Sequence, residues 1–483
     1  MRSVMGRSVR TRRLRHHAPV PTPARLPRWR LLPLVIACFL LGTQASTAET
    51  LADVLVRAYQ TNPQLNAERA RQRGTDENVS QALSQYRPQI TAGLSAGLIG
   101  VRNLLPEGDT QSARLKPWSV GLTVNQTLFN GFKTGNTVRQ AEAQVRSGRE
   151  LLRSVEQSVL LDAVTVYASV LANQSLVEAM RANVGFLRET LNTTKRRLDA
   201  GDVTPTDQAQ AEARLARGNA DLNAAEVTLA VSQATFLQVI GTPPGHLVPP
   251  QPIDRLIPPN RSDAVAISYR EHPTVLGATF DVDAAQLGIS IAEAAQAPTV
   301  SVQGNIQRSV QTDTQLGTNR TDSASIIGQA NIPIYDGGLA ASQVRQAKQV
   351  VSQSRLLLDR IRTQAETAAI AAFVTHEGMR TAIAAADAEV RAATLALNGV
   401  QKEAQAGQRT TLDVLNAQQD LILARSRLIQ AQKDRVIASY TLLAAIGRLD
   451  HKQLALNTPD YDPQVHYHQV RDAWHGLRTP SGQ

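Results

Sequence analysis

The stretch Trp118-Ser119-Val120-Gly121-Leu122-Thr123-Val124-Asn125-Gln126-Thr127-Leu128 decides the fold class of this chain. Its side chains alternate: one face carries Trp118, Val120, Leu122, Val124 and Leu128, interrupted by Gln126, and the other carries only Ser, Gly, Thr and Asn. Successive side chains of a β-strand point to opposite faces, so this pattern predicts a strand. An uncharged polar face opposite an apolar one is typical of a membrane barrel with lipid outside and a polar lumen. An ordinary soluble sheet stays open as the alternative.

Three further stretches without charge resemble this strand. Thr299–Gln307 alternates as cleanly, and Ile90–Val101 and Ala324–Ile334 are looser versions. The polar segments between them, Asn103–Pro117 and Arg308–Asp322, are expected to be surface loops. The sequence therefore predicts four strands in two hairpins.

The hairpins belong to an internal repeat. Leu128-Phe129-Asn130-Gly131 returns 206 residues later as Ile334-Tyr335-Asp336-Gly337, and the offset still holds where Ile240-Gly241 matches Ile446-Gly447. The matched residues include glycines and aspartates, which are not the residues that generally fill Ala-rich helices, so the match is not chance similarity between such helices. The expected organisation is a signal peptide (1–48), a first repeat (49–242), a Pro-rich linker (243–262), a second repeat (263–449) and a periplasmic C-terminal tail (450–483).

Long helices follow the strands in both copies. Residues 137–200 and 339–406 contain no proline, and 64 helical residues extend about 96 Å. The returning helix carries apolar residues seven apart and a second seam of small residues, which predict close helix packing. The apolar seam consists of Leu215, Leu222, Leu229 and Phe236, and the small-residue seam consists of Ala211, Gly218, Ala225 and Ser232. Short links at Gly201–Pro205 and Gly407–Thr410 predict helical hairpins with sharp tips, although a soluble coiled coil would explain the heptads equally well.

The first 48 residues read as an export signal. They hold nine arginines and no acid, then the apolar run Leu31–Gly42 and the small residues 45–48, so we expect cleavage after Ala48. The rest of the chain has 42 basic and 41 acidic residues, which removes the basic surface that nucleic-acid binding needs. The only cysteine, Cys38, lies in the leader, and its lipidation stays open. No other segment approaches 18 apolar residues, so we expect no helix to span a membrane.

A four-strand chain cannot be a complete membrane barrel. Open sheet edges are not tolerated in lipid, and the smallest common barrel has eight strands. At least two chains must therefore contribute, and three would give twelve strands.

The residues resemble the TolC family of outer-membrane efflux proteins. The resemblance covers residues 49–477 and rests on the duplication, the joints at 128–131 and 334–337, and the tip Gly407-Gln408-Arg409-Thr410-Thr411-Leu412-Asp413-Val414-Leu415. The tail from Tyr461-Asp462-Pro463 to Trp474-His475-Gly476-Leu477 looks like the end of the secretion-type branch.

The resemblance implies a homotrimer with a twelve-strand barrel in the outer membrane and a twelve-helix periplasmic tunnel. It implies an exit channel for a tripartite efflux pump or type I secretion system, whose partners are a periplasmic adaptor and an inner-membrane pump or ABC exporter. It places a gate at Thr206, Asp207, Arg409 and Asp413, and adaptor contacts at Gly201 and Gly407. The chain departs from the family at Ala404, where a gate tyrosine occurs, and at Asn416, which replaces a second acidic ring.

Other classes of function receive less support. No nucleotide loop or hydrolase motif is present, so we expect no enzyme and no cofactor. His466 and His468 lack the clustered partners of a metal site. The main alternative is a soluble periplasmic coiled-coil adaptor or scaffold, which would share the export signal and the helical hairpins.

Overall fold

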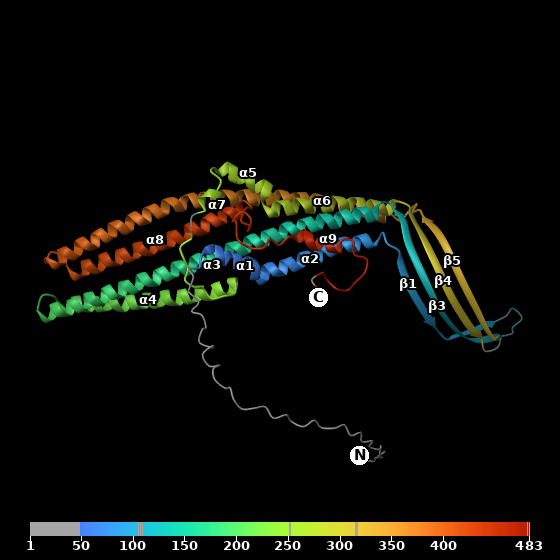
Figure 1. Ribbon diagram of the computed structural model, residues 1–483, viewed down its shortest axis with the longest axis horizontal. Helices are drawn as coiled ribbons and strands as arrows, with labels where there is room; N and C mark the ends of the chain where they lie inside the picture. Colours follow the sequence, from blue (N-terminus) through green and yellow to red (C-terminus); the bar gives the residue numbers. More distant parts are fainter. Residues whose placement is uncertain are drawn as a thin grey trace, which may run out of the picture. The chain divides into compact units, whose positions relative to one another are not determined.

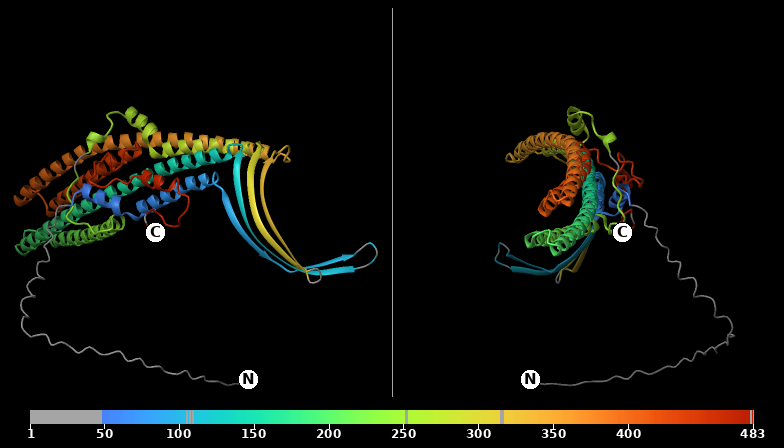
Figure 2. Two further views of the ribbon diagram at one scale, coloured as in Figure 1. Left: turned by 45° about the vertical axis from the view of Figure 1, so that its right-hand side comes forward. Right: turned by 90° about the vertical axis from the view of Figure 1, so that its left-hand side faces the viewer.

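The computed structural model describes residues 49–104, 106, 108, 110–250, 253–313, 317–480 and 482. The predicted signal peptide and Cys38 lie outside the described residues. In the described part, helices run along one long axis and a β-sheet continues from one end (Figure 1). A view along this axis shows the helices in a curved layer (Figure 2).

Four long helices form two hairpins, as the sequence predicted. The long members α3 and α7 have 67 residues each, about 100 Å, because neither contains a proline. Shorter helices precede each sheet hairpin, and one lies in the C-terminal tail. The helices are α1 (Leu51–Thr61), α2 (Pro63–Ser84), α3 (Lys133–Asp199), α4 (Pro205–Ile240), α5 (Arg261–Glu271), α6 (Pro273–Glu293), α7 (Leu339–Gln405), α8 (Thr411–Ala445) and α9 (Pro463–Val470).

The strands form one antiparallel sheet in the order β1-β3-β4-β5. Their bounds are β1 (Gln89–Ala96), β2 (Ile99–Leu104), β3 (Thr110–Asn130), β4 (Thr299–Asp313) and β5 (Gly317–Asn331). The short β2 continues the line of β1, because both pair with β3 in one register. The described chain therefore supplies four strand positions, with the first one interrupted.

The predicted loops are wrong. Most of Asn103–Pro117 lies in β3, and Arg308–Asp322 lies largely in β4 and β5. The backbone ladder continues through both segments, for example where Lys116 pairs with Thr312. Charged side chains had hidden the alternation there, but hydrogen bonding between strands does not depend on it. At the other end β5 stops at Asn331, two residues before Pro333, which has no N–H to donate.

The small-residue seam lets α4 approach α3 closely. Ala211 is fully buried, and a Cβ at Gly218 would lie 2.7 Å from Leu187 Cδ1. Leu222, in the apolar seam, is only half-buried. The small seam therefore packs within the chain along its first three members, while the apolar seam packs fully only at Phe236, which is buried in the main core.

Tyr167 on α3 is fully buried in the main hydrophobic core, and its hydroxyl donates to the carbonyl of Glu49 at 3.0 Å.

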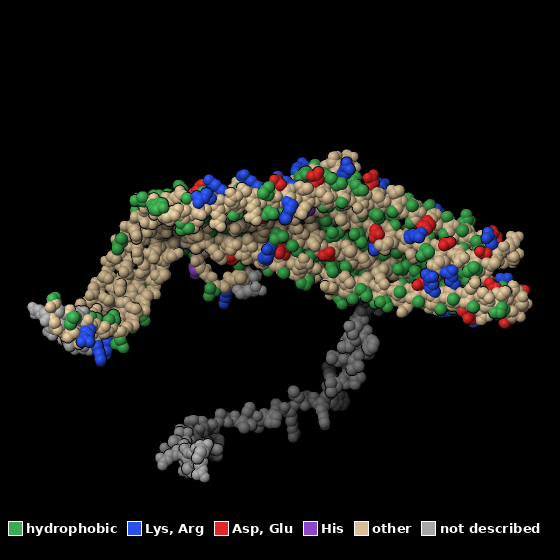
Figure 3. Space-filling model, turned by 180° about the vertical axis from the view of Figure 1, so that it is seen from behind, with side chains coloured by type: hydrophobic (Ala, Val, Ile, Leu, Met, Phe, Trp, Pro, Cys, Tyr) green, Lys and Arg blue, Asp and Glu red, His purple; other side chains and the backbone are tan. Residues whose placement is uncertain are grey.

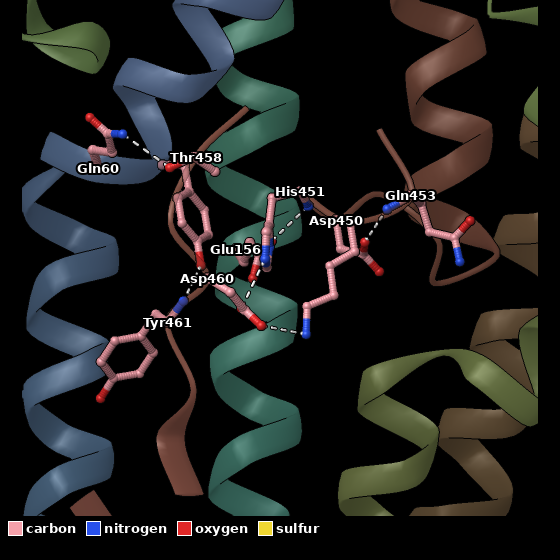
Figure 4. A network of polar contacts seen from close by, with 10 residues as sticks. Gln60, Glu156, Asp450, His451, Gln453, Thr458, Asp460 and Tyr461 are labelled. Atoms are coloured by element: carbon pink, nitrogen blue, oxygen red, sulfur yellow. Dashed lines mark hydrogen bonds and ion pairs between the residues drawn. The ribbon is translucent and has the colours of Figure 1, made fainter. Parts of the chain in front are cut away.

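The C-terminal segment docks onto the middle of the helices. Nearby, His451 Nδ1 lies 2.7 Å from Glu156 Oε1, and its Nε2 lies 3.0 Å from Asp460 Oδ1 (Figure 4). The hydrogen bond that His451 donates to the Glu156 carboxylate raises the pKa of His451, and this effect outweighs burial, which lowers it.

Two helical stretches, Lys133–Asp199 and Arg261–Gln296, contain an 18-residue window apolar enough to cross a membrane by length and composition. Neither window is an uninterrupted apolar run, so the statement that no helix spans a membrane stays a prediction. The window in α3 is 56% buried and contributes to the main core, whereas the window in Arg261–Gln296 is 28% buried, with Val275 and Val282 packed against Leu358 of α7.

Candidate channel wall and helix tips

The sheet has two chemically different faces. Ser119, Thr123 and Gln307 line a hollow of about 320 Å³ on its concave side. On the convex side Leu122 is 42% exposed and Ile306 is 64% exposed. Leu122 and Ile306 are directly opposite each other, so the apolar row continues from strand to strand. The predicted separation of an apolar face from an uncharged polar face is present.

The sheet is open at both sides. Within the described residues, β1 and β2 pair only with β3, and β5 pairs only with β4. Each outer strand therefore presents unpaired N–H and C=O groups along one edge, which a lipid environment cannot satisfy. A curved sheet with two open edges and an apolar convex face is the geometry of a barrel segment.

Both helix hairpins turn at a left-handed glycine. The φ angle is +82° at Gly201 and +75° at Gly407, a region that favours glycine. In each tip the next residue donates back across the last helical turn: Asp202 N to Arg197 O at 2.8 Å, and Gln408 N to Glu403 O at 2.9 Å. A Cβ at either glycine would meet nothing within 4 Å, so neither glycine packs against another part of the described chain.

The two candidate gate aspartates begin the returning helices. Asp207 Oδ2 accepts hydrogen bonds from the Thr204 amide at 2.9 Å and the Thr204 hydroxyl at 2.8 Å. Asp413 accepts from the Thr410 amide at 3.0 Å and its hydroxyl at 2.8 Å. Each threonine accepts in return from the aspartate amide, which completes a capping box. The backbone hydrogen bond lowers the pKa of both carboxyls, so they stay ionised at neutral pH.

The other two candidates lie at the surface of the tips. Thr206 is exposed at the start of α4. Arg409 is exposed, and its Nε donates to Glu403 Oε2 of its own hairpin at 2.9 Å. Within this chain Arg409 does not reach Asp207, and Glu403 is a partner that the sequence did not reveal.

Sequence reasoning also missed the contacts between the two hairpins. Arg214 Nη2 donates to Asn416 Oδ1 at 2.9 Å, and the buried Gln418 Nε2 donates to Asn183 Oδ1 at 2.8 Å. A groove of about 570 Å³ lies between the tips, with Phe186 and Arg197 on one side and Val414 on the other. No sequence signal pairs these residues, because they are about 200 positions apart.

Residues 54–242 and 268–448 match the family described as outer membrane efflux protein. The chain belongs to this family. It is 40% identical over 457 residues to the outer membrane efflux protein BepC of Brucella suis biovar 1, an alignment that covers 93% of this chain and 98% of BepC. It is 25% identical over 445 residues to the outer membrane protein TolC of Vibrio cholerae, with 88% and 97% covered.

Solved structures agree on the fold of this efflux protein. The Campylobacter jejuni CmeC outer membrane channel superposes with a TM-score of 0.73 at 15% identity, covering 87% of this chain and 89% of CmeC. The TolC-family resemblance is thus confirmed. The chain is an outer-membrane channel protein with a large periplasmic part, not an enzyme, and the soluble-adaptor alternative is wrong.

Among the described residues, no group of three or more His, Cys, Asp or Glu side chains is arranged to hold a metal ion. His466 Nδ1 instead lies 3.0 Å from the fully buried Asp76 Oδ2. This contact ties the tail to α2.

Proposed function

We propose that three copies of this chain close a twelve-strand barrel in the outer membrane and extend it as a twelve-helix tunnel into the periplasm. The observation that carries this proposal is the pair of open sheet edges on a sheet with an apolar convex face. Three copies would pair the β1 edge of one chain with the β5 edge of the next, and no edge would remain in lipid. The concave Ser, Thr, Asn and Gln side chains then line a water-filled lumen.

The assembly state is tested by the mass of the mature protein in detergent. We expect three times the mass of one chain together with a strong β signal. A stable monomer that keeps the full β signal would contradict the barrel.

We propose that this channel receives its substrates from an inner-membrane pump or ABC exporter through a periplasmic adaptor. The exposed glycine tips and the groove between them support this site, because Gly201 and Gly407 leave space for an incoming hairpin. The relative that is 40% identical is named an efflux protein, which favours efflux over protein secretion for this chain.

We propose that the tunnel closes at the tips. Arg409 has only its Nε bonded to a described residue, so both Nη groups can donate to Asp207 or Thr206 of a neighbouring copy. One ring of three Asp413 carboxylates, one from each copy, would also concentrate cations at the entrance. Exposed ion pairs contribute only about 0–1 kcal/mol each, which suits a latch that an adaptor must release.

The gate is tested by single-channel recording in planar bilayers. Arg409→Ser combined with Asp207→Ala should raise conductance without changing the melting temperature of the trimer much. Asp413→Asn should weaken cation preference, because it removes the charge but keeps an oxygen that accepts from the Thr410 amide.

The matched control is Thr410→Ala, which removes the other half of the same cap and leaves the carboxylate. If Thr410→Ala changes ion selectivity as much as Asp413→Asn does, the effect comes from the helix cap and not from an acidic ring. Variants that conduct like the parent would show that the gate does not lie at these residues.

A further inference from the structure

At the outer end of the apolar row, the convex face of the sheet becomes basic. Arg114 and Lys116 precede Trp118 on β3 at two-residue steps, so they share its face. Both side chains are exposed, and no carboxylate among the described residues pairs with either. The space-filling view shows Lys or Arg side chains beside hydrophobic ones at this end of the sheet (Figure 3).

Two arginines extend the basic surface across the neighbouring strands. Arg308 on β4 lies opposite Val120, which faces the convex side, and Asp322 on β5 lies opposite Arg308. Arg320 is two residues before Asp322 and therefore points the same way. We call Arg114, Lys116, Arg308 and Arg320 the basic rim. With Asp322 included, the rim carries four positive charges and one negative charge per chain.

Asp322 holds the two guanidinium groups side by side. Arg308 Nε donates to Asp322 Oδ1 at 2.6 Å, and Arg320 Nη2 donates to Asp322 Oδ2 at 2.7 Å. The Nη1 groups of both arginines donate to no described residue, and the side chains are 47% and 55% exposed. One carboxylate thus orders two guanidiniums and leaves a net positive charge with free donors. Paired guanidiniums match the geometry of phosphate oxygens better than ammonium groups do.

The height of the rim places it at a membrane surface. The convex row on β3 runs from Trp118, past Gln126, to the β-bulge at Leu128, ten residue steps or about 33 Å along the strand. At the usual barrel tilt this row spans about 25 Å of bilayer, the height of the lipid-facing band. The end at Asn130 joins the long helices (Figure 1), so Trp118 marks the outer end of the row. Arg114 and Lys116 lie beyond this end, and Arg308 and Arg320 lie level with its last two apolar positions, Val120 and Trp118.

We propose that the basic rim binds the phosphate groups of an anionic lipid in the outer leaflet of the outer membrane. The proposal rests on the membrane orientation of the proposed channel and adds a ligand that the channel function does not require. A lipid is the occupant because the rim faces away from the lumen and directly adjoins the apolar band. The phosphates of the lipid headgroup contact the free Nη1 groups, and the acyl chains of the same lipid cover Leu122 and Ile306.

The test uses the detergent-purified parent trimer and native mass spectrometry. The probes are diphosphoryl lipid A, lipid A without its phosphates, and inorganic phosphate. The parent should retain diphosphoryl lipid A and release the dephosphorylated lipid, and inorganic phosphate at the same concentration should not bind. Equal retention of both lipids, or binding of free phosphate alone, would overturn the proposal.

Variants separate charge from geometry. Arg114→Gln with Lys116→Gln should weaken lipid binding about 25-fold, because each cation at an anionic lipid surface contributes about fivefold. Arg308→Lys with Arg320→Lys keeps the charge but removes the planar donors. It should weaken lipid binding by less than Arg114→Gln with Lys116→Gln does. The control Arg188→Gln with Lys402→Gln removes two exposed cations from α3 and α7 and should bind lipid like the parent.

Channel recordings keep this proposal distinct from the proposed function. A parent that is trimeric and conducts ions but shows no preference for the phosphorylated lipid refutes only the lipid site. A parent that is monomeric and does not conduct refutes the channel itself. If both glutamine substitutions leave lipid retention unchanged while the trimer stays intact, the basic rim is not the binding site.

Discussion

Replacing Leu122 with arginine tests which face of the sheet meets lipid. Leu122 lies on the convex face opposite Ala92 and Ile306, and it is 42% exposed in one chain. It is four residues from Trp118 and six from Leu128, close to the middle of the apolar row. An arginine near the bilayer midplane costs a barrel about 2–4 kcal/mol.

The penalty acts once per chain, so a trimer would lose about 6–12 kcal/mol if the three terms add. That is comparable with the whole stability of a typical domain, about 5–15 kcal/mol. We therefore expect Leu122→Arg to abolish the trimer in outer-membrane extracts analysed by size-exclusion chromatography.

Thr123→Arg is the matched control, because Thr123 is the next residue and lines the concave hollow. It should assemble like the parent and lower cation conductance, since it adds a positive ring to the lumen. If both variants assemble equally well, or if Thr123→Arg is the one that fails, the assignment of the two faces is wrong.

Three further predictions concern the helices and the tail. Gly218→Val should lower the melting temperature, because its side chain overlaps Leu187 and overpacking costs about 1–3 kcal/mol; Leu187→Ala in the same chain should restore part of the loss. The raised pKa of His451 means that its protonated form, held by Glu156, stabilises the fold fully below its ordinary pKa of 6.5. That stability is lost as the pH rises through the raised folded-state pKa, so melting curves from pH 5 to 9 should fall for the parent and stay flatter for His451→Gln. Thr410→Ala should cost about 1 kcal/mol of local helix stability, seen as faster amide exchange in the first turn of α8, and unchanged exchange would show that the cap is dispensable.

Local patterns in the sequence were enough for much of the architecture. Side chains alternate on a strand and recur every 3.6 residues on a helix, so the sheet faces at 118–128 and the long helices followed from backbone geometry alone. The capping boxes are equally local, because Thr204 and Asp207 are three residues apart, as are Thr410 and Asp413. The strand ends at 103–117 and 308–322 were missed, since charge replaced the apolar pattern while the ladder continued.

Contacts between distant segments were decided only by the tertiary structure. His451 meets Glu156 from 295 positions away, and Arg214 meets Asn416 from 202 positions away. Arg308 reads as a loop residue in the sequence, yet strand pairing brings it beside Asp322 on the lipid face. The periodicity of a sequence predicts which face of a strand or helix a side chain occupies. Which residue it contacts depends on strand register and helix packing, and no local sequence pattern predicts these.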